Sequence, residues 1–320
     1  MIKYGLIGIS SILPRFLTGL KKSKDSAACA VSSRNNDKAE EFAVTYDIPH
    51  HYGDYRELLG DPDVDVVYIS TPNNTHYEIA LAALAAGKNV ILEKPFTVTY
   101  REALELIETA EKLDLFIMEG QKAVFLPTTK KIKELISEGA IGRVDYIYLP
   151  ASSNYKFPED NWMNSYDQGG GSLLGSACYG MAFASYICGS EITKAQSLEI
   201  HQPDKADYLT NLSFQLAQGT IVNTVLGMEI NTVNRCYIYG SKGHIYLDNF
   251  WKSKALTLVL PDKAPQEFLF PYDSEFTFYI DHVSELLQAG FKESPVMTRQ
   301  LTLQIVKFVD DLFQEYLRNA

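Results

Sequence analysis

Short apolar runs and amphipathic stretches alternate along the first 120 residues. The apolar runs have the length and composition of buried β-strands, and they cover residues 4–7, 27–31, 64–70, 90–92 and 115–118. The amphipathic stretches between them repeat at helical spacing, and they cover residues 13–20, 37–46, 75–86 and 100–113. Continuous apolar strands separated by amphipathic helices are typical of a parallel sheet covered on both faces. We therefore predict a doubly wound α/β domain whose ligand site lies beyond the carboxyl ends of its strands.

The pattern changes after residue 119. A helical stretch, a strand and a glycine triplet lead into a second helical run; these cover residues 127–138, 143–149, 169–171 and 172–188. Strand-like runs with short turns follow at 195–201, 209–216, 220–228, 235–239, 244–247 and 256–260. Two helical stretches, 275–288 and 298–318, come last. This order predicts a second, α+β domain built on a large, mostly antiparallel open sheet.

Length and charge narrow the class of protein. A chain of 320 residues is longer than one hydrophobic core usually spans, so we expect two domains, 1–120 and 121–320, and the C-terminal helix can pack back on the first. The net charge of −11 argues against nucleic acid or an anionic membrane as the main partner. The four cysteines lack the C-x-x-C spacing of a zinc site, and we expect neither a metal nor disulfides.

The expected location is the cytoplasm. The strand pattern begins within the first residues, MIKYGLIGIS, which leaves no signal-peptide pattern. No apolar run approaches the roughly 20 residues that span a bilayer.

The segment GLIGISSI carries the first candidate cofactor contacts, at a predicted strand-to-helix turn. A dinucleotide fingerprint reads G-x-G-x-x-G there and places pyrophosphate on the helix N-terminus. Only Gly8 keeps its position, because Ser10 and Leu13 replace the second and third glycines. Ser10 is small enough for a phosphate to approach, and we include its neighbours Ser11 and Ile12 in the predicted cofactor site.

The end of the second predicted strand discriminates between NAD and NADP. An NAD site usually has an Asp or Glu here, which binds the ribose 2′-hydroxyl. Residues 30–34 read AVSSR and include no acid. Ser33 and Arg34 suit a 2′-phosphate, since a guanidinium binds phosphate through paired, charge-assisted hydrogen bonds. We predict NADP in preference to NAD; the structural alternative is an exposed Arg34 at a helix start.

Two further strand ends carry polar residues. The third strand runs into TPNNTH, where the predicted cofactor contacts are Thr71, Pro72, Asn73 and His76. A turn at residues 72–73 and a helix cap at Asn74 or Thr75 would explain the same segment structurally. The fourth strand, NVIL, ends in Glu93, Lys94 and Pro95, for which a solvated strand end is the structural alternative.

The chain resembles the Gfo/Idh/MocA family (glucose–fructose oxidoreductase, inositol dehydrogenase, rhizopine catabolism) in the segments GLIGISSI, SSR, YISTPNNTHYEIALAALAAGKNVILEKPF, SEGAIGRV and GGGSLLGSACYG. These segments cover nearly the whole chain in the family's order, and TPNxxH followed by AAGKxVxxEKP is their most specific part. The resemblance implies a Rossmann dinucleotide-binding domain at 1–120 and, at 121–320, an α+β domain for substrate binding and dimerisation through its sheet.

The resemblance also implies roles for residues around the nicotinamide. The family's catalytic lysine falls on Lys94, beside a prolyl bond that is typically cis. Its ammonium would orient a substrate oxygen and stabilise alkoxide charge, and Glu93 would orient Lys94 or the cofactor. In MEGQKAVF, Glu119 and Gln121 fall on cofactor-contact positions, and Lys122 reaches either substrate or solvent.

The family's acid/base position falls on Tyr179, whose phenol would transfer the proton that accompanies hydride transfer. Many members have an Asp four residues earlier on the same helix face, where this chain has Gly175. Tyr179 would then work with Lys94 alone, or be an aromatic that packs on the sheet. The loop before the glycine triplet offers candidate substrate contacts, which are Lys156, Asn161 and Trp162.

The expected function is therefore NADP(H)-dependent hydride transfer to or from a hydroxyl or carbonyl carbon of a sugar, polyol or trans-dihydrodiol, by a homodimer. The alternative is a non-catalytic dinucleotide-binding sensor or regulator on the same fold. Gly175 favours the alternative, whereas Lys94 and Tyr179 favour the enzyme.

Overall fold

The computed structural model describes residues 1–319 and divides into two compact units. Unit 1 holds Met1–Gly120 and Asp273–Leu303. Unit 2 holds Gln121–Tyr272 and the chain from Gln304 onward. The segment Asp273–Leu303 thus belongs with the N-terminal strands, although it is distant from them in sequence.

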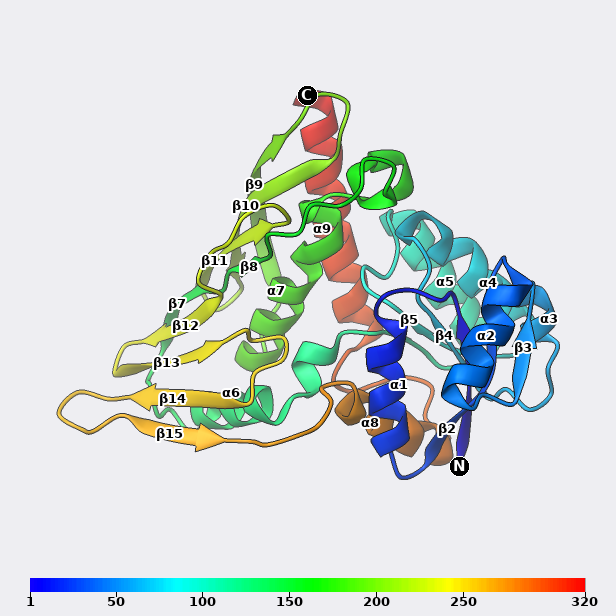
Figure 1. The fold of residues 1–320 in the computed structure, drawn as a ribbon. Helices are drawn as coiled ribbons and strands as arrows, with labels where there is room; N and C mark the ends of the chain where they lie inside the picture. The colour runs from blue at the N-terminus through cyan, green and yellow to red at the C-terminus, as the bar shows by residue number, and fades with distance from the viewer. Residues whose placement is uncertain (320) are drawn as a thin grey trace. The chain divides into compact units, whose positions relative to one another are not determined.

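Unit 1 is built on a six-stranded parallel sheet (Figure 1). Its strands are β1 (Ile2–Ile7), β2 (Ser26–Ser32), β3 (His50–Tyr52), β4 (Val66–Ile69), β5 (Asn89–Leu92) and β6 (Ile117–Glu119). Their order, β3-β2-β1-β4-β5-β6, reverses direction at β1, which is the arrangement of a dinucleotide-binding fold. The predicted doubly wound parallel sheet is confirmed, and β3 is a strand that the sequence pattern did not reveal.

Helices connect the successive strands of unit 1. They are α1 (Leu13–Lys22), α2 (Asn36–Tyr46), α3 (Tyr55–Leu59), η1 (Asn73–Thr75), α4 (His76–Ala85) and α5 (Tyr100–Lys112). A further helix, α8 (Thr277–Gln288), packs against α1, β1 and β2. Gly19 makes this packing possible, because a Cβ there would lie 2.6 Å from the Cβ of Phe276. Phe276 and Phe16 are both fully buried, with ring centroids 6.0 Å apart.

Unit 2 is built on a nine-stranded sheet that is mostly antiparallel, as predicted. Its strands are β7 (Val144–Tyr148), β8 (Ala151–Ser152), β9 (Ile192–His201), β10 (Asp207–Leu216), β11 (Ile221–Gly227), β12 (Arg235–Gly240), β13 (Gly243–Asp248), β14 (Ala255–Val259) and β15 (Gln266–Leu269). Only the pairs that β11 makes with β7 and β8 are parallel. The last strand, β15, was not predicted; its four residues have no alternating apolar pattern.

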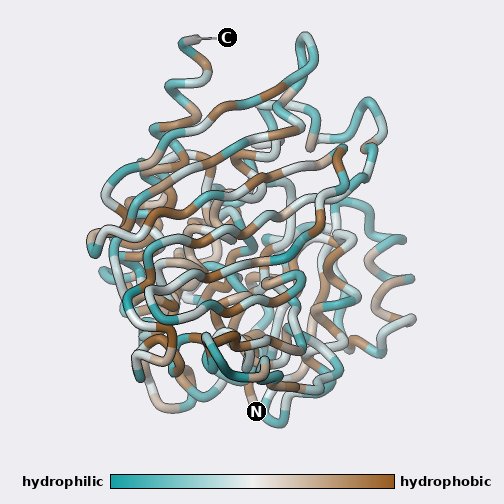
Figure 2. Tube along the Cα trace, turned by 90° about the vertical axis from the view of Figure 1, so that its left-hand side faces the viewer, coloured by the Kyte–Doolittle hydropathy of each residue, from teal (hydrophilic) through white to brown (hydrophobic). Residues whose placement is uncertain are grey.

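One face of this sheet is covered by helices and the other is open. The helices of unit 2 are η2 (Lys122–Phe125), α6 (Pro127–Ser137), η3 (Trp162–Asn164), η4 (Tyr166–Gln168) and α7 (Ser172–Cys188), together with α9 (Arg299–Asn319) from Gln304 onward. Helix α7 packs against α6, β10 and β11, over buried side chains such as Leu212 and Val222. Figure 2 looks from the side of the sheet, whose strands run side by side across the view.

The open face carries six aromatic rings on adjacent strands, here called the aromatic face: Tyr146, Tyr148, Tyr237, Tyr239, His244 and Tyr246. The register aligns them in two rows, one through Tyr148, Tyr237 and Tyr246 and one through Tyr146, Tyr239 and His244. Ring centroids within and between the rows lie 5.6–6.4 Å apart.

The amino end of α7 is fixed by a buried carboxylate. Asp207 is 1% exposed, and its Oδ2 accepts hydrogen bonds from Ser172 Oγ, Leu173 N and Thr210 Oγ1 at 2.5–2.9 Å. The charge of the carboxylate also complements the positive end of the helix dipole. Gly171, with φ of 102°, precedes the helix, and a Cβ there would collide with Asp207 Oδ1. Asp207 and Gly171 therefore determine where α7 begins, and the start of the helix in turn determines the position of Tyr179.

No helix within residues 1–319 is long and apolar enough to cross a membrane. The four cysteines are free thiols; Cys29, Cys178 and Cys236 are buried and Cys188 is half-buried.

Candidate active site

The carboxyl end of β1 lies in close contact with the carboxyl end of β4. Gly8 has φ of 92°, and a Cβ there would lie 2.7 Å from Thr71 Cγ2. Ser10 Oγ donates to Ser70 Oγ at 3.0 Å, and Ser70 Oγ donates to the Gly8 carbonyl at 3.0 Å. A glycine at position 8 is therefore required by the close approach of two strand-to-helix turns.

Helix α1 begins directly after this turn without a side-chain cap. Its N-cap is Ile12, which makes no capping hydrogen bond, and no acidic residue occupies the first turn. Ser11 is exposed and Ile12 is half-buried. Leu13 N and Arg15 N donate to the carbonyls of Ser10 and Ile12, and Pro14 has no N–H, so it is the positive end of the helix dipole that favours a bound anion at this terminus.

Arg34 lies exposed at the end of β2. The N-cap of α2 is Asn35, whose side chain accepts a hydrogen bond from Lys38 N at 3.0 Å. Ser33 Oγ accepts from Asn35 N at 3.3 Å. Within residues 1–319, the guanidinium of Arg34 makes no hydrogen bond or ion pair with the protein. The side chain of Arg34, at the β2–α2 turn, therefore stabilises no other part of the described chain through a polar contact.

His76 connects two of the predicted turns. It is 1% exposed, and its ring nitrogens lie 2.9 Å from the Pro95 carbonyl oxygen and 3.1 Å from the Thr71 carbonyl oxygen. Burial lowers the pKa of His76, although both carbonyls oppose that shift. The predicted side-chain cap at residue 75 is wrong, because Thr75 Oγ1 donates backwards to Thr71 Oγ1 and to the Pro72 carbonyl. Asn73 is buried in η1, and Pro72 is half-buried before it.

The turn after β5 holds Lys94 between fixed carboxylates. The Lys94–Pro95 peptide is cis, as expected. Glu93 is 9% exposed; its Oε1 accepts from Tyr68 OH at 2.7 Å and its Oε2 accepts from Lys94 N at 3.1 Å. Phe96, which follows Pro95, donates its N–H to Glu119 Oε1 at 3.1 Å. Hydrogen bonds thus fix the backbone on both sides of the half-buried Lys94.

Glu119 and Gln121 are buried polar side chains with unused capacity. Glu119 is 1% exposed, and its Oε2 has no hydrogen-bond partner among the described residues. Burial raises the pKa of Glu119 to about 7, against the effect of the Phe96 N–H. Gln121 is fully buried, and neither its amide nitrogen nor its amide oxygen is bonded within residues 1–319. An unpaired buried amide costs about 1–3 kcal/mol, which a ligand can recover.

In unit 2, Tyr179 lies half-buried on α7, one turn beyond Gly175. Gly175 is buried, and a Cβ there would lie 3.4 Å from Met163 Cε, an ordinary van der Waals contact. The loop that carries η3 folds onto the glycine triplet, since Gly171 N donates to the Met163 carbonyl at 3.0 Å. This brings half-buried Trp162 near the start of α7. Lys156 is exposed in the preceding loop, and sequence reasoning had missed Met163 altogether.

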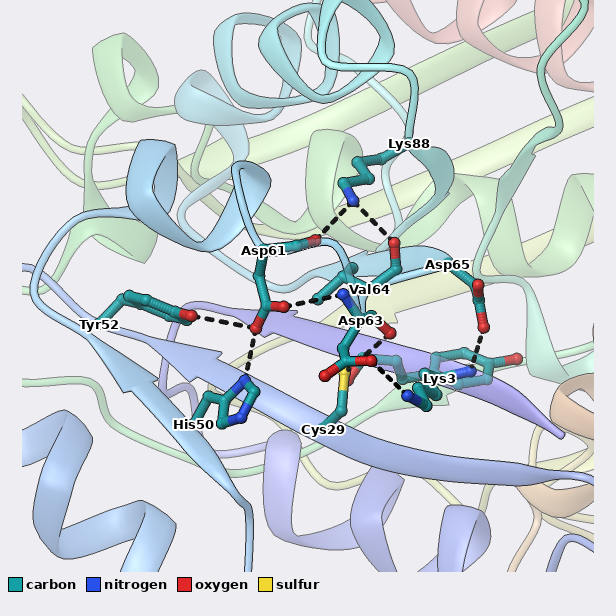
Figure 3. A network of polar contacts seen from close by, with 10 residues as sticks. Lys3, Cys29, His50, Tyr52, Asp61, Asp63, Val64, Asp65 and Lys88 are labelled. Atoms are coloured by element: carbon teal, nitrogen blue, oxygen red, sulfur yellow. Dashed lines mark hydrogen bonds and ion pairs between the residues drawn. The ribbon is translucent and has the colours of Figure 1, made fainter.

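A second polar cluster, at the amino ends of the strands of unit 1, has a structural explanation. His50, Asp61 and Asp63 place possible metal-ligand atoms within 4.8 Å of one another (Figure 3). Protein donors already occupy these carboxylates: His50 Nδ1 lies 2.6 Å from Asp61 Oδ2, Tyr52 OH donates to the same oxygen, and Lys3 Nζ donates to Asp63 at 2.5 Å. We therefore assign no metal to this cluster.

The buried carboxyl of Glu119 makes a specific pH dependence testable. Its pKa is about 7 in the folded protein, above its ordinary 4.5, so folding favours the protonated form. The free energy of unfolding then falls as pH rises from about 4.5 to about 7 and levels off above. Glu119→Gln keeps the acceptor for Phe96 N–H and does not titrate. Its stability relative to wild type should rise between pH 5 and pH 8 by up to about 3 kcal/mol.

Urea unfolding at both pH values measures this difference. Glu108→Gln makes the same chemical change at an exposed position of α5 and should leave the pH dependence unchanged. A Glu119→Gln curve parallel to wild type would show that Glu119 does not titrate in this range.

Comparison with known proteins relates both units to one family. Residues 2–121 match the model of an oxidoreductase family with an NAD-binding Rossmann fold, and residues 129–246 match the GFO/IDH/MocA C-terminal domain. The trans-1,2-dihydrobenzene-1,2-diol dehydrogenase of Mus musculus is 30% identical over 306 residues, covering 92% of this chain and 91% of its own. The Oryctolagus cuniculus enzyme of that name is 31% identical and covers 84% of each chain.

Solved structures give the same result. KijD10, a 3-ketoreductase from Actinomadura kijaniata solved with NADP and TDP-benzene, has a TM-score of 0.89 at 25% identity, covering 98% of this chain and 97% of its own. An aldose-aldose oxidoreductase from Caulobacter crescentus shares the fold, with a TM-score of 0.87 at 24% identity, covering 100% and 98%. With matching models in both units and relatives at 30–31% identity across most of its length, the chain belongs to the Gfo/Idh/MocA family of NAD-binding oxidoreductases.

Proposed function

We propose that the protein is an NADP(H)-dependent oxidoreductase that transfers hydride between nicotinamide and a hydroxyl or carbonyl carbon of a sugar, polyol or trans-dihydrodiol. One observation carries the proposal: Lys94 extends from a turn whose backbone is fixed by Glu93 and Glu119, at the carboxyl ends of β5 and β6. In an α/β sheet this is where ligands bind. The dehydrogenase and ketoreductase relatives support the same chemistry.

The residues present fit a dinucleotide. The close-packed turn at Gly8 and the uncapped start of α1 suit a pyrophosphate, with Ser10, Ser11 and Ile12 on that turn. Gln121 has a fully buried amide with spare donors and acceptors, which suits the nicotinamide carboxamide. The exposed guanidinium of Arg34, next to Ser33, suits a 2′-phosphate and is the basis for preferring NADP.

The proposed catalytic groups are Lys94 and Tyr179. Bound nicotinamide supplies or accepts the hydride. Lys94 orients the substrate oxygen and stabilises the negative charge that develops on it. Tyr179 exchanges a proton with that oxygen. The part of α7 that holds Gly175 and Tyr179, with Trp162 and Lys156 in the preceding loop, is the proposed substrate side of unit 2.

We also propose that two copies associate through the aromatic face. Tyr239 is 39% exposed in this sheet, and Leu198 and Ile221 on the same side are 78% and 49% exposed. Exposed apolar side chains on one face of a sheet favour an interaction site there. A two-fold interface would bring the same rings from both copies together.

The cofactor preference can be tested by fluorescence titration with NADPH and NADH. Arg34→Ala should weaken NADPH binding at least tenfold, about 1.4 kcal/mol, because a charge-assisted pair is lost, and should leave NADH binding unchanged. Lys38→Ala removes a nearby exposed charge from α2 and should affect the two cofactors equally. Equal weakening of both cofactors by Arg34→Ala would contradict the 2′-phosphate assignment.

The catalytic pair can be tested with a panel of sugars, polyols and trans-dihydrodiols in the presence of NADP⁺. Lys94→Ala and Tyr179→Phe should each lower kcat by about 10²–10⁴-fold with nearly unchanged NADPH affinity, because the lost interactions act on the reacting oxygen. Tyr186→Phe, two turns further along α7, should retain activity. Cofactor binding without turnover of any panel member would favour the dinucleotide sensor instead.

The dimer can be tested by sedimentation velocity. Tyr239→Asp places a charge on the aromatic face and should convert a particle of two chains into one of a single chain. Phe291→Asp, at a position that is 58% exposed in unit 1, is the control and should leave the sedimentation coefficient unchanged. A single-chain particle for the wild type would overturn the dimer proposal.

A further inference from the structure

Lys122 is a buried lysine that the proposed mechanism leaves without a role. Lys122 is the first residue of η2, directly after Gln121, and it is only 5% exposed. Of the two alternatives expected for Lys122, substrate or solvent, this burial disfavours solvent. Burying an ammonium costs free energy unless its surroundings compensate the charge. Helix η2 packs against α7 and α6, so its neighbours in unit 2 can supply that compensation.

One compensating group is the ring of Tyr179. Lys122 Nζ lies 5.7 Å from the centroid of the Tyr179 ring. A cation within about 6 Å of an aromatic face is attracted by the ring quadrupole, more strongly when water is excluded. Both residues belong to unit 2, and Asp207 fixes the start of the helix that carries Tyr179.

We propose that Lys122 is a positioning residue for proton transfer, which holds the Tyr179 ring and stabilises the negative charge left when the phenolic proton departs. The inference rests on the proposed function. During carbonyl reduction, the substrate carbon gains a hydride from the reduced nicotinamide, and the substrate oxygen gains the proton of Tyr179. In the reverse direction the Tyr179 oxygen takes the hydroxyl proton while the carbon loses its hydride to the oxidised nicotinamide.

Lys122 stabilises the two protonation states of Tyr179 to different extents. A neutral phenol offers a cation only its quadrupole, whereas a phenolate offers a full negative charge. The attraction of Lys122 is therefore greater after the proton has left than before. Interactions that strengthen along the reaction coordinate accelerate the chemical step. Lys122 would thus be a second cation, in addition to Lys94, that stabilises the deprotonated form of Tyr179. This chain has Gly175, and no carboxylate, one turn earlier on the same helix.

The chain contains a matched control pair on the same helix. Lys133 of α6 places its Nζ 3.9 Å from the ring centroid of Tyr186 of α7. Tyr186 lies two helical turns beyond Tyr179, outside the proposed machinery. Lys133→Met therefore removes a lysine–tyrosine contact of the same kind, and it should lower the melting temperature without changing kcat or KM.

The test measures kcat and KM for Lys122→Met, Lys122→Gln and Lys122→Arg, each with and without Tyr179→Phe. The two neutral variants should lower kcat about 10–30-fold and change KM less than threefold, because the lost interaction acts in the transition state. Lys122→Arg keeps the cation and should recover most of kcat. In the Tyr179→Phe background, loss of Lys122 should have no further effect on kcat, because its partner is gone.

Several outcomes would overturn the proposal. Wild-type kcat in both neutral variants, or an undiminished loss in the Tyr179→Phe background, would show that Lys122 does not act through Tyr179. A raised KM with unchanged kcat would make Lys122 a substrate-binding group. Turnover by the wild type separates this failure from that of the proposed function: a wild type without turnover on the whole panel would overturn both.

Discussion

The turn that carries Lys94 depends on the satisfaction of buried polar groups at the carboxyl ends of three strands. Glu93 accepts from Tyr68 and from the Lys94 backbone, Glu119 accepts from Phe96, and His76 lies between the carbonyls of Thr71 and Pro95. Each group is buried, so an unmade hydrogen bond would not be recovered from water. The network therefore fixes the backbone of the turn, and it does so with side chains that come from β4, α4, β5 and β6.

A different buried carboxylate does the same for unit 2. Asp207, at the start of β10, accepts three hydrogen bonds at the amino end of α7. The carboxylate can come this close because Gly171 has no Cβ, which would otherwise collide with Asp207 Oδ1. Tyr179 lies two turns along this helix, so its position follows from a contact with a strand 28 residues further along the chain. Both proposed catalytic side chains thus stand on backbone held by carboxylates that take no part in the proposed chemistry.

The short segment from Glu119 to Lys122 departs most clearly from the usual rules of burial. Three of its four residues have polar or charged side chains that are almost fully buried, and two of these leave hydrogen-bonding atoms unpaired within residues 1–319. Burying these unpaired polar groups destabilises the folded protein, and no contact within residues 1–319 offsets that free energy for the unpaired atoms. Local departures of this kind are expected where a protein binds or transforms a ligand. Along the chain, the segment joins β6 of unit 1 to η2 of unit 2.

The sequence by itself determined the elements whose signal is local. Apolar runs and helical spacing predicted five of the six strands of unit 1 and the mostly antiparallel sheet of unit 2, because side-chain periodicity follows directly from backbone geometry. The resemblance to the family rested instead on the residue types in motifs such as those around Gly8 and Lys94, which can be recognised in sequence without a structure. Only the tertiary structure decided that α8 packs against α1, that Asp207 caps α7 and that the ammonium of Lys122 lies over Tyr179. These contacts join residues from 34 to more than 250 positions apart in sequence, and no local pattern specifies which distant partner satisfies a buried charge.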